Sequence, residues 1–172
     1  SPGGITAWMV EDHSVPIISL RLAFRGGTAI DPAGKDGLAQ MTANLLDEGA
    51  ADLDSQAFQN RLADLSISLS FNAATDNFGG TLRTLVKNKD AAFDLLRLSV
   101  TQPRFDDEPV ERLRGQIKNI IQRQANDPDQ IAGRVFFRTV LADHPYGRPS
   151  RGNAESIASI TRDDMLALVH DR

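Results

Sequence analysis

The side chains of this sequence that most readily bind metals or transfer protons are few and widely separated. The three histidines are His13, His144 and His170, and they share no spacing typical of metal ligands. We therefore expect ordinary surface histidines. A metal site that combines His13 or His144 with nearby acidic residues is kept as a second hypothesis. The chain has no cysteines, which excludes disulfides, thiol catalysis and cysteine-based zinc sites.

The remaining motifs that carry chemistry are weak. Asp47 and Glu48 form a carboxylate pair, which we interpret as the solvated end of a helix. The acidic residues 106–108 stand at a helix start, where negative charge offsets the positive end of the helix dipole. The serines lack a G-x-S-x-G context, and no phosphate-binding G-x-x-x-x-G-K-[ST] loop occurs. The pair Gly79-Gly80 indicates a strand bulge or a close backbone approach.

The composition describes a globular domain of ordinary size. Its 172 residues are 41% hydrophobic and carry a net charge of −4, with an isoelectric point of about 5.3. An acidic chain has no general basic face for nucleic acid, so we predict no nucleic-acid partner. We interpret Arg112 and Arg114 as part of a solvated helix face. No apolar run approaches the roughly 18 residues that a membrane span requires.

Periodicity of the apolar residues predicts the elements that position any site. Alternation predicts strands at 5–10 and 16–24, and a hairpin of strands at 67–73 and 78–86 that turns at 75–77. Strand pairs alternating with helix pairs favour one α+β domain over residues 1–172, with a mostly antiparallel sheet covered by helices on one face. The predicted helices cover residues 36–46, from Asp54 or Ser55 to about 65, 91–100, 108–124, 127–141, and a last helix that starts at Thr161 with a Thr161/Asp164 capping box.

Several stretches together resemble the N-terminal half-domain of the insulinase/pitrilysin family of inverted zinc metallopeptidases, which includes the mitochondrial processing peptidase. They cover nearly the whole chain. The order and spacing of the stretches make the resemblance specific, although each alone is weak. They are GITAWMVEDHSVPIISLRLAFRGGTAIDPAGKDGLAQM, then LLDEGA followed by DSQAFQNRLADLSISLSFNAATD, and finally HPYGRPSRGNAESIASITRDDM.

In active members of this family a helix carries H-x-x-E-H. The two histidines, one turn apart on one face, bind zinc, and the glutamate activates the zinc-bound water. Carried over to this sequence, the first ligand falls on Gln40, the base on Ala43 and the second ligand on Asn44. The third ligand, a glutamate on a later helix, falls on Gln116 at a separation close to the family pattern.

All four of these positions lack the required group. An amide oxygen is a poor zinc ligand compared with imidazole or carboxylate, and alanine has no base. The resemblance therefore implies a non-catalytic subunit without zinc. Such members pair with an active homologous zinc peptidase, so that the two enclose a chamber for an unfolded peptide. It also implies a second, similar half-domain in the full-length protein, and we expect a periplasmic rather than a cytoplasmic protein. A structural scaffold subunit of the same fold is the other alternative.

Two further expectations concern binding surfaces. We predict that Gln40, Asn44 and Gln116 form a cluster of hydrogen-bonded amides where zinc would sit. We also expect most of the phenylalanines to be core residues, with the apolar edge of the 67–86 hairpin as a possible surface for a peptide added as a strand. These phenylalanines are Phe71, Phe78, Phe93, Phe105, Phe136 and Phe137.

Overall fold

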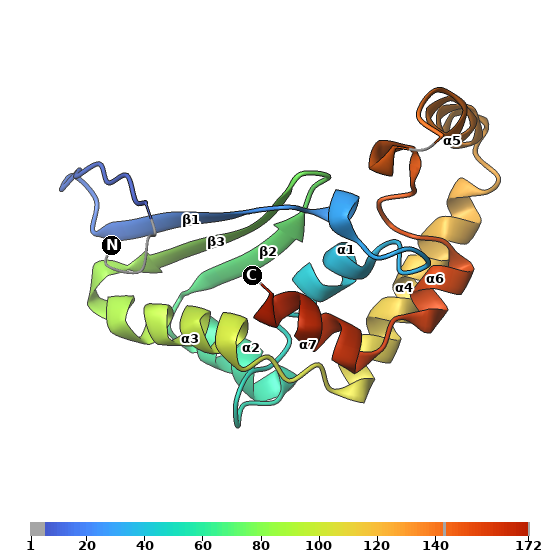
Figure 1. The fold of residues 1–172 in the computed structure, drawn as a ribbon. Coiled ribbons are helices and arrows are strands. Elements are labelled where there is room, and N and C mark those ends of the chain that lie inside the picture. The colour runs from blue at the N-terminus through green and yellow to red at the C-terminus, as the bar shows by residue number, and fades with distance from the viewer. Residues whose placement is uncertain (1–5, 143, 172) are drawn as a thin grey trace.

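A three-stranded antiparallel sheet organises the computed structural model, which describes residues 6–142 and 144–171 (Figure 1). The strands are β1 (Ile17–Arg25), β2 (Ser68–Ala73) and β3 (Asn77–Leu85), and their order is β1-β3-β2. Strands β2 and β3 form the predicted hairpin, with Leu69 opposite Leu82. The central strand β3 pairs with β1 along its whole length.

Helices cover one face of this sheet, which confirms the predicted α+β class (Figure 1). Helices α1, α2 and α3 contact the strands directly, whereas α7 packs on α1 and α3, and α4 contacts α6. The described helices are α1 (Leu38–Ala43), α2 (Ser55–Asp64), α3 (Lys89–Thr101), α4 (Asp107–Gln124), α5 (Pro128–Val140), α6 (Ala154–Ser159) and α7 (Arg162–His170), with 3-10 turns η1 (Thr28–Ile30), η2 (Val86–Asn88) and η3 (Pro145–Gly147).

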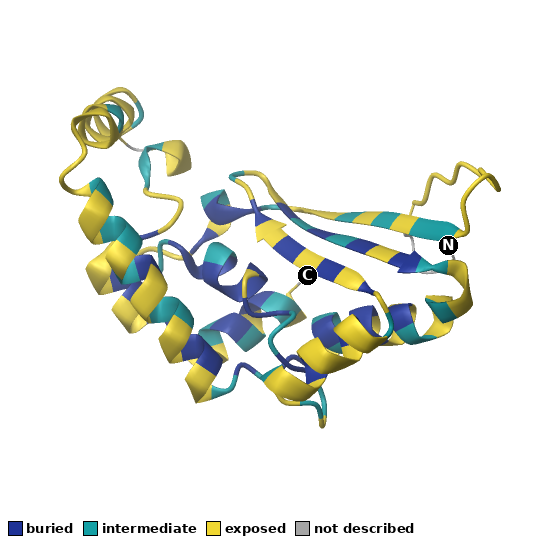
Figure 2. Ribbon diagram, turned by 180° about the vertical axis from the view of Figure 1, so that it is seen from behind, coloured by how far each residue is buried: buried dark blue, intermediate teal, exposed yellow. Residues whose placement is uncertain are grey.

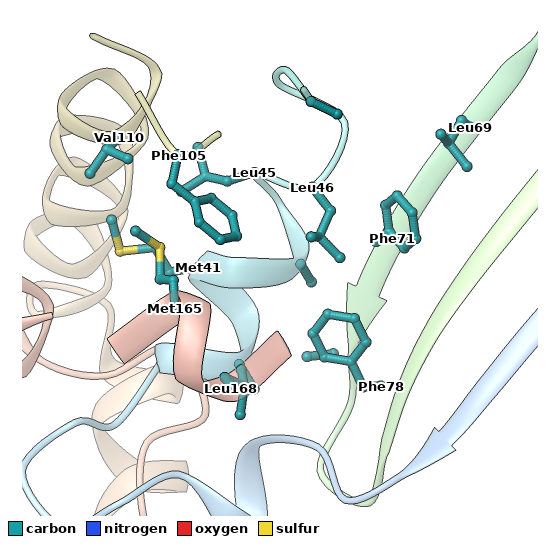
Figure 3. Close-up of a cluster of buried hydrophobic side chains, with 14 of the residues drawn as sticks. Met41, Leu45, Leu46, Leu69, Phe71, Phe78, Phe105, Val110, Met165 and Leu168 are labelled. Carbon is teal, nitrogen blue, oxygen red and sulfur yellow. The ribbon is translucent and has the colours of Figure 1, made fainter. Parts of the chain in front are cut away.

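The core lies between the sheet and these helices (Figures 2 and 3). Alternate residues of β2 point inward, so that Leu69 and Phe71 are buried while the serines between them are exposed. On the helical side, Met41 of α1 is fully buried close to Met165 of α7. The short helix α1 is therefore buried on several sides, which fixes the backbone of residues 40–44.

Gly80 shows why the glycine pair is needed in β3. It stands opposite both Leu22 and Phe71, and the strand ladder continues through it without a bulge. A Cβ atom at this position would lie 2.9 Å from Cδ1 of Phe71. The expected bulge is therefore wrong. The close backbone approach occurs at Gly79, where a Cβ atom would lie 3.1 Å from the Leu22 carbonyl oxygen, whereas the close neighbour of Gly80 is a side chain of β2.

Side chains that cap helices set the element boundaries as predicted. Asp54 accepts a hydrogen bond from the Ala57 amide at 2.8 Å and starts α2. Thr161 and Asp164 form the predicted capping box of α7. A second capping box, between Asn153 and Ser156, starts α6, a helix that the sequence interpretation missed. Six residues are too few for a recognisable apolar period, so the cap was the available signal.

Two expectations about elements are wrong. Residues 6–10 form no strand, and Ile5 lies outside the described residues. Trp8 and Val10 are each 93% exposed, because β1 pairs only with β3 among the described strands and supplies no partner for this segment. The helix predicted at 36–46 spans only Leu38–Ala43, since Gly37 precedes it with a φ of 92° and turns follow it.

Helix α5 departs most from the predicted core. It projects away from the sheet (Figure 1), and none of its described residues is buried. Phe136 and Phe137 are 60% and 53% exposed, and Phe93 of α3 is 43% exposed, whereas Phe71, Phe78 and Phe105 are buried as expected. The period of its apolar residues predicted the helix correctly, but a period does not indicate whether another part of the chain covers the apolar face.

Candidate functional site

An open pocket of about 390 Å³ lies between the end of α1, the middle of α4 and the loop before α6. Gln40, Asn44 and Gln116, the three positions that correspond to zinc ligands, all line it. The fold thus brings the three positions to one pocket. The complete lining is Gln40, Asn44, Glu48, Arg112, Leu113, Gln116, Ile117, Ile120 and Arg151.

The predicted cluster of hydrogen-bonded amides is not present. Within residues 6–142 and 144–171, the side chains of Gln40, Asn44 and Gln116 make no hydrogen bond to one another. The side chains of Asn44 and Gln116 face solvent, where water competes with amide–amide contacts. The amides therefore stand side by side as separate donors and acceptors.

Ala43, at the position of the catalytic base, does not line this pocket. Its exposure is 0%, and it belongs to the hydrophobic core. The methyl group of Ala43 offers no proton acceptor, so the residue at the base position cannot activate a water molecule. The degenerate base position has become a packing position.

The ionised groups of the pocket are Glu48 and Arg112, which we interpreted from the sequence as solvated, and Arg151, which we did not consider there. Glu48 accepts hydrogen bonds from Arg112 Nη2 at 2.9 Å and from Ser55 Oγ at 2.5 Å. The hydrogen bond to Glu48 is the largest cause that raises the pKa of Arg112. With Arg151, the pocket holds one carboxylate and two guanidinium groups. Its formal charge is therefore one positive, which disfavours a divalent cation.

Asp31 holds the first turn of α1 in place. It is 3% exposed, and its carboxylate oxygens accept hydrogen bonds from the amides of Gly37 at 2.9 Å and Ala39 at 3.0 Å. Burial raises the pKa of Asp31, while these two amides and Arg148 oppose the rise. Gly37 itself offers no side-chain cap, so a carboxylate six residues earlier does this work.

The motif residue Arg148 fastens the loop that carries Asp31. Its guanidinium donates to the carbonyls of Asp31 at 2.8 Å and Pro32 at 3.0 Å, and it pairs with the Asp36 carboxylate. Three bonds from one planar group to a single turn leave that turn little freedom. The late motif that contains Arg148 thus supports the start of α1, although more than a hundred residues separate them.

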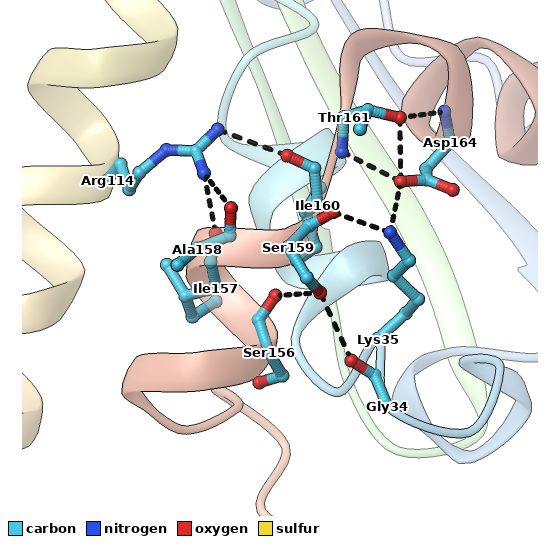
Figure 4. Close-up of polar contacts among 10 residues, drawn as sticks. All are labelled: Gly34, Lys35, Arg114, Ser156, Ile157, Ala158, Ser159, Ile160, Thr161 and Asp164. Atoms are coloured by element: carbon cyan, nitrogen blue, oxygen red, sulfur yellow. Dashed lines mark hydrogen bonds and ion pairs between the residues drawn. The ribbon is translucent and has the colours of Figure 1, made fainter.

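Helix α6 connects α4 with the segment before α1 (Figure 4). Arg114 of α4 donates to the carbonyls of Ile157, Ala158 and Ile160 at 2.9, 2.8 and 3.1 Å. At the other end of α6, Ser156 donates to the Asp36 carbonyl at 2.9 Å. Arg114 is only 13% exposed, so its interpretation as solvated helix face was wrong. The site is held together even though its metal ligands are absent.

Replacing Arg114 by methionine tests this connection. We expect Arg114→Met to lower the free energy of unfolding by about 2 kcal/mol, because three carbonyls lose a charged donor while the stem keeps its packing. Urea unfolding measures the change. The matched control Arg123→Met removes an exposed arginine from the same helix and should stay within about 0.5 kcal/mol. Equal effects of the two changes would contradict the connection.

The Asp47–Glu48 pair is not the solvated helix end that we expected. Both residues are half-buried, and Glu48 is engaged with Arg112 and Ser55. Burial raises the pKa of Asp47 to about 6, a hydrogen bond from its own backbone amide opposes the rise, and the Glu48 charge adds to it. The sequence suggests that Asp47 and Glu48 are solvated, but α2 and α4 pack around them and enclose them.

Asp47 should therefore make the stability depend on pH. Its pKa is higher in the folded state than in the unfolded state, so stability is lost as pH rises between about 4 and 6. We expect Asp47→Asn to raise the free energy of unfolding by about 2 kcal/mol above pH 6, with little effect near pH 4. Urea unfolding at both pH values checks this. The exposed-residue control Asp64→Asn should show no such trend, and a pH-independent effect of Asp47→Asn would refute the assignment.

The histidine hypothesis receives no support from the geometry. Among residues 6–142 and 144–171, no group of three or more histidine, cysteine, aspartate or glutamate side chains is placed to hold a metal ion. His13 is exposed and lies 3.8 Å from Glu11, while Nδ1 of His144 accepts a hydrogen bond from the Tyr146 amide.

Among the helices that the structure describes, none is long and apolar enough to cross a membrane.

The sheet, the helices on one of its faces and the ligand positions on α1 and α4 define a zinc-peptidase-like half-domain. The model of the insulinase family (peptidase family M16) matches residues 7–153, and the chain belongs to this family. This confirms the family identified from the sequence motifs.

Two comparisons concern proteins described as inactive. A "non-peptidase homolog", YmxG, of Helicobacter pylori is 29% identical over 155 residues, which are 90% of this chain and 36% of the relative. The crystal structure of a "peptidase M16 inactive domain" from Pseudomonas fluorescens has a TM-score of 0.87 and 28% identity, covering 93% of this chain and 39% of that one.

Other relatives carry protease names. An uncharacterized zinc protease of Rickettsia bellii is 22% identical over 165 residues, which are 95% of this chain and 40% of the relative. A structure described as a protease from Helicobacter pylori has a TM-score of 0.77 and 19% identity, and it supports the fold alone. The chain spans about two fifths of the length of these proteins.

Proposed function

We propose that this protein is a non-catalytic subunit of a two-component zinc peptidase. In this proposal it binds no zinc, pairs with an active homologue that carries H-x-x-E-H, and helps to enclose a chamber for an unfolded peptide. The observation that carries the proposal is the pocket, in which the helices bring the ligand positions together but the side chains that bind zinc are absent from these positions. Gln40, Asn44 and Gln116 line it together, and Ala43 is buried beside it.

The proposal rests on what zinc hydrolysis requires. A hydrolytic zinc site needs three protein ligands and a base for the bound water. Amides in a pocket of positive formal charge are poor ligands, and alanine supplies no base. The names of the Helicobacter and Pseudomonas relatives, which describe a non-peptidase and an inactive domain, agree with this reading.

Strand β2 is the part of the fold that best suits contact with a peptide. It lies at the edge of the sheet and, among the described strands, pairs only with β3. Its apolar side chains Leu69 and Phe71 are buried, so the apolar edge that we expected is not exposed. What β2 offers is its unpaired backbone, flanked by exposed Ser68, Ser70 and Asn72, to which an extended peptide can add as a strand.

Two further parts of the proposal concern the full-length protein. A second half-domain of similar fold would complete it, since this chain spans about two fifths of its relatives. The proposed compartment is the periplasm, which fractionation of cells that produce the full-length protein would test.

Reconstitution with a homologue tests the function. The full-length protein and an H-x-x-E-H homologue encoded in the same genome are purified alone and together, and cleavage of an unfolded peptide is measured. We expect no cleavage by this protein alone, and a clear gain when it joins its partner. Tight zinc at one ion per chain would overturn the proposal in favour of a relocated metal site. A stable complex without any gain would instead favour a scaffold subunit.

A further inference from the structure

The pocket at the degenerate metal site has an excess of positive charge in an acidic protein. The whole chain has a net charge of −4, yet the pocket holds two arginines and one glutamate. One oxygen of Glu48 accepts from both Arg112 and Ser55, so the charge of this carboxylate is paired with Arg112. The pocket therefore retains the charge of one guanidinium group that no carboxylate in it balances.

That group belongs to Arg151. Its side chain makes no hydrogen bond or ion pair within residues 6–142 and 144–171, although most arginines around it do. Its backbone is nevertheless closely held. A Cβ atom on Gly37 would lie 2.7 Å from the Arg151 carbonyl oxygen, and one on Gly152 would lie 2.1 Å from the Asp36 carbonyl oxygen. This tight contact between the two loops fixes Arg151 at the pocket.

The three amides complete the chemistry of the pocket. Each amide side chain offers two N–H donors and one oxygen acceptor, and in the described structure those of Gln40, Asn44 and Gln116 are not used on one another. Such groups match the N–H and C=O of a peptide bond. A guanidinium group matches a carboxylate, to which it can donate two parallel hydrogen bonds.

We propose that this pocket binds a peptide through a carboxylate, with the carboxylate at Arg151 and the neighbouring peptide groups at Gln40, Asn44 and Gln116. The inference rests on the proposed function, because the chamber brings peptides to this wall. In place of a zinc ion that polarises the peptide bond, the site then holds an uncleaved peptide by its charge. The carboxylate belongs either to the peptide C-terminus or to an acidic side chain.

Nuclear magnetic resonance titration of the ¹⁵N-labelled protein tests the proposal with three probes. They are N-acetyl tetra-alanine with a free C-terminal carboxylate, its C-terminal amide, and an amidated peptide of the same length with one internal aspartate. We expect saturable shifts of the side-chain NH₂ signals of Gln40, Asn44 and Gln116 with a carboxylate probe. The uncharged amide should bind at least about tenfold more weakly, since a charged hydrogen bond is lost.

The comparison between the two charged probes identifies the source of the carboxylate. Arg151→Gln should weaken binding at least about tenfold, whereas Arg123→Gln, which removes the same charge from an exposed site on α4, should leave it within about twofold. Equal binding of all three probes, no shift at the three amides, or unchanged binding by Arg151→Gln would each overturn the proposal.

The same variant separates this inference from the proposed function. If Arg151→Gln loses peptide binding and the gain in partner cleavage falls with it, both stand. If binding depends on Arg151 while the wild-type protein gives its partner no gain, the site stands and the proposed function fails. If the gain persists and no carboxylate probe binds, the proposed function stands and the site fails.

Discussion

The triple variant Gln40→His/Asn44→His/Gln116→Glu should bind one zinc ion per chain. All three positions line one pocket, and Asp31, Arg148 and Arg114 hold the helices that carry them. Two imidazoles and a carboxylate form a zinc-binding set, and the new glutamate also cancels the positive charge of the pocket. We expect a Kd below about 1 µM and at least about a thousandfold tighter binding than the wild type. Competition with a chromogenic chelator measures it.

A matched control is available on α2. Gln56 and Asn60 repeat the spacing of Gln40 and Asn44 on the exposed face of α2, where the Gln56 amide donates to Asn60 at 2.8 Å. The variant Gln56→His/Asn60→His has two histidines but no third ligand, so it should bind zinc at least about tenfold more weakly than the triple variant. Ala43 is left unchanged, because a glutamate at a fully buried core position would bury a carboxylate. Equal zinc affinities of the triple variant and this control would mean that the site frame is not preserved.

Asp31→Ala should be among the most destabilising single changes outside the core. The substitution leaves the amides of Gly37 and Ala39 buried without their acceptors, at a cost of about 3 kcal/mol in the free energy of unfolding. Because the pKa of Asp31 is higher in the folded state than in the unfolded state, protonation at low pH stabilises the wild type but not the variant, so the loss should grow toward acidic pH. Urea unfolding at two pH values measures both effects.

Two comparisons keep this prediction falsifiable. Asp31→Asn retains one acceptor oxygen for two amides and should be intermediate, at about 2 kcal/mol. Asp52→Ala removes an exposed aspartate from a loop and should stay within about 0.5 kcal/mol. If Asp31→Ala proved as mild as Asp52→Ala, the start of α1 would not depend on this carboxylate.

The elements that were predicted correctly are those with local signals. The β2–β3 hairpin follows from alternation and a polar turn, and α2 and α7 begin where Asp54 and Thr161 cap them. The errors arose where a local pattern needs a distant partner. Residues 6–10 alternate like a strand, but no described strand pairs with them, and α5 has an apolar period that nothing described in this chain covers.

The residues of the candidate site likewise fall into those that the sequence predicted and those that it could not. Family motifs placed Gln40, Ala43, Asn44 and Gln116 at the ligand and base positions, and residue identity alone excluded ordinary zinc chemistry there. Motif reasoning could not select Glu48, Arg112 and Arg151, because none of them belongs to the zinc-binding pattern. A single guanidinium without a carboxylate partner has no signature in a linear sequence.

By itself, the sequence determined that the four family positions for zinc binding and proton transfer lack the required functional groups, since such groups are either present or absent in a side chain. The tertiary structure decided what occupies the vacated positions. Packing buried Ala43, aligned three amides along one pocket and brought Arg151 to it through the contact between Gly37 and the loop before α6. Those outcomes depend on contacts between residues far apart in the chain, and long-range packing is the part of folding that local propensity does not encode.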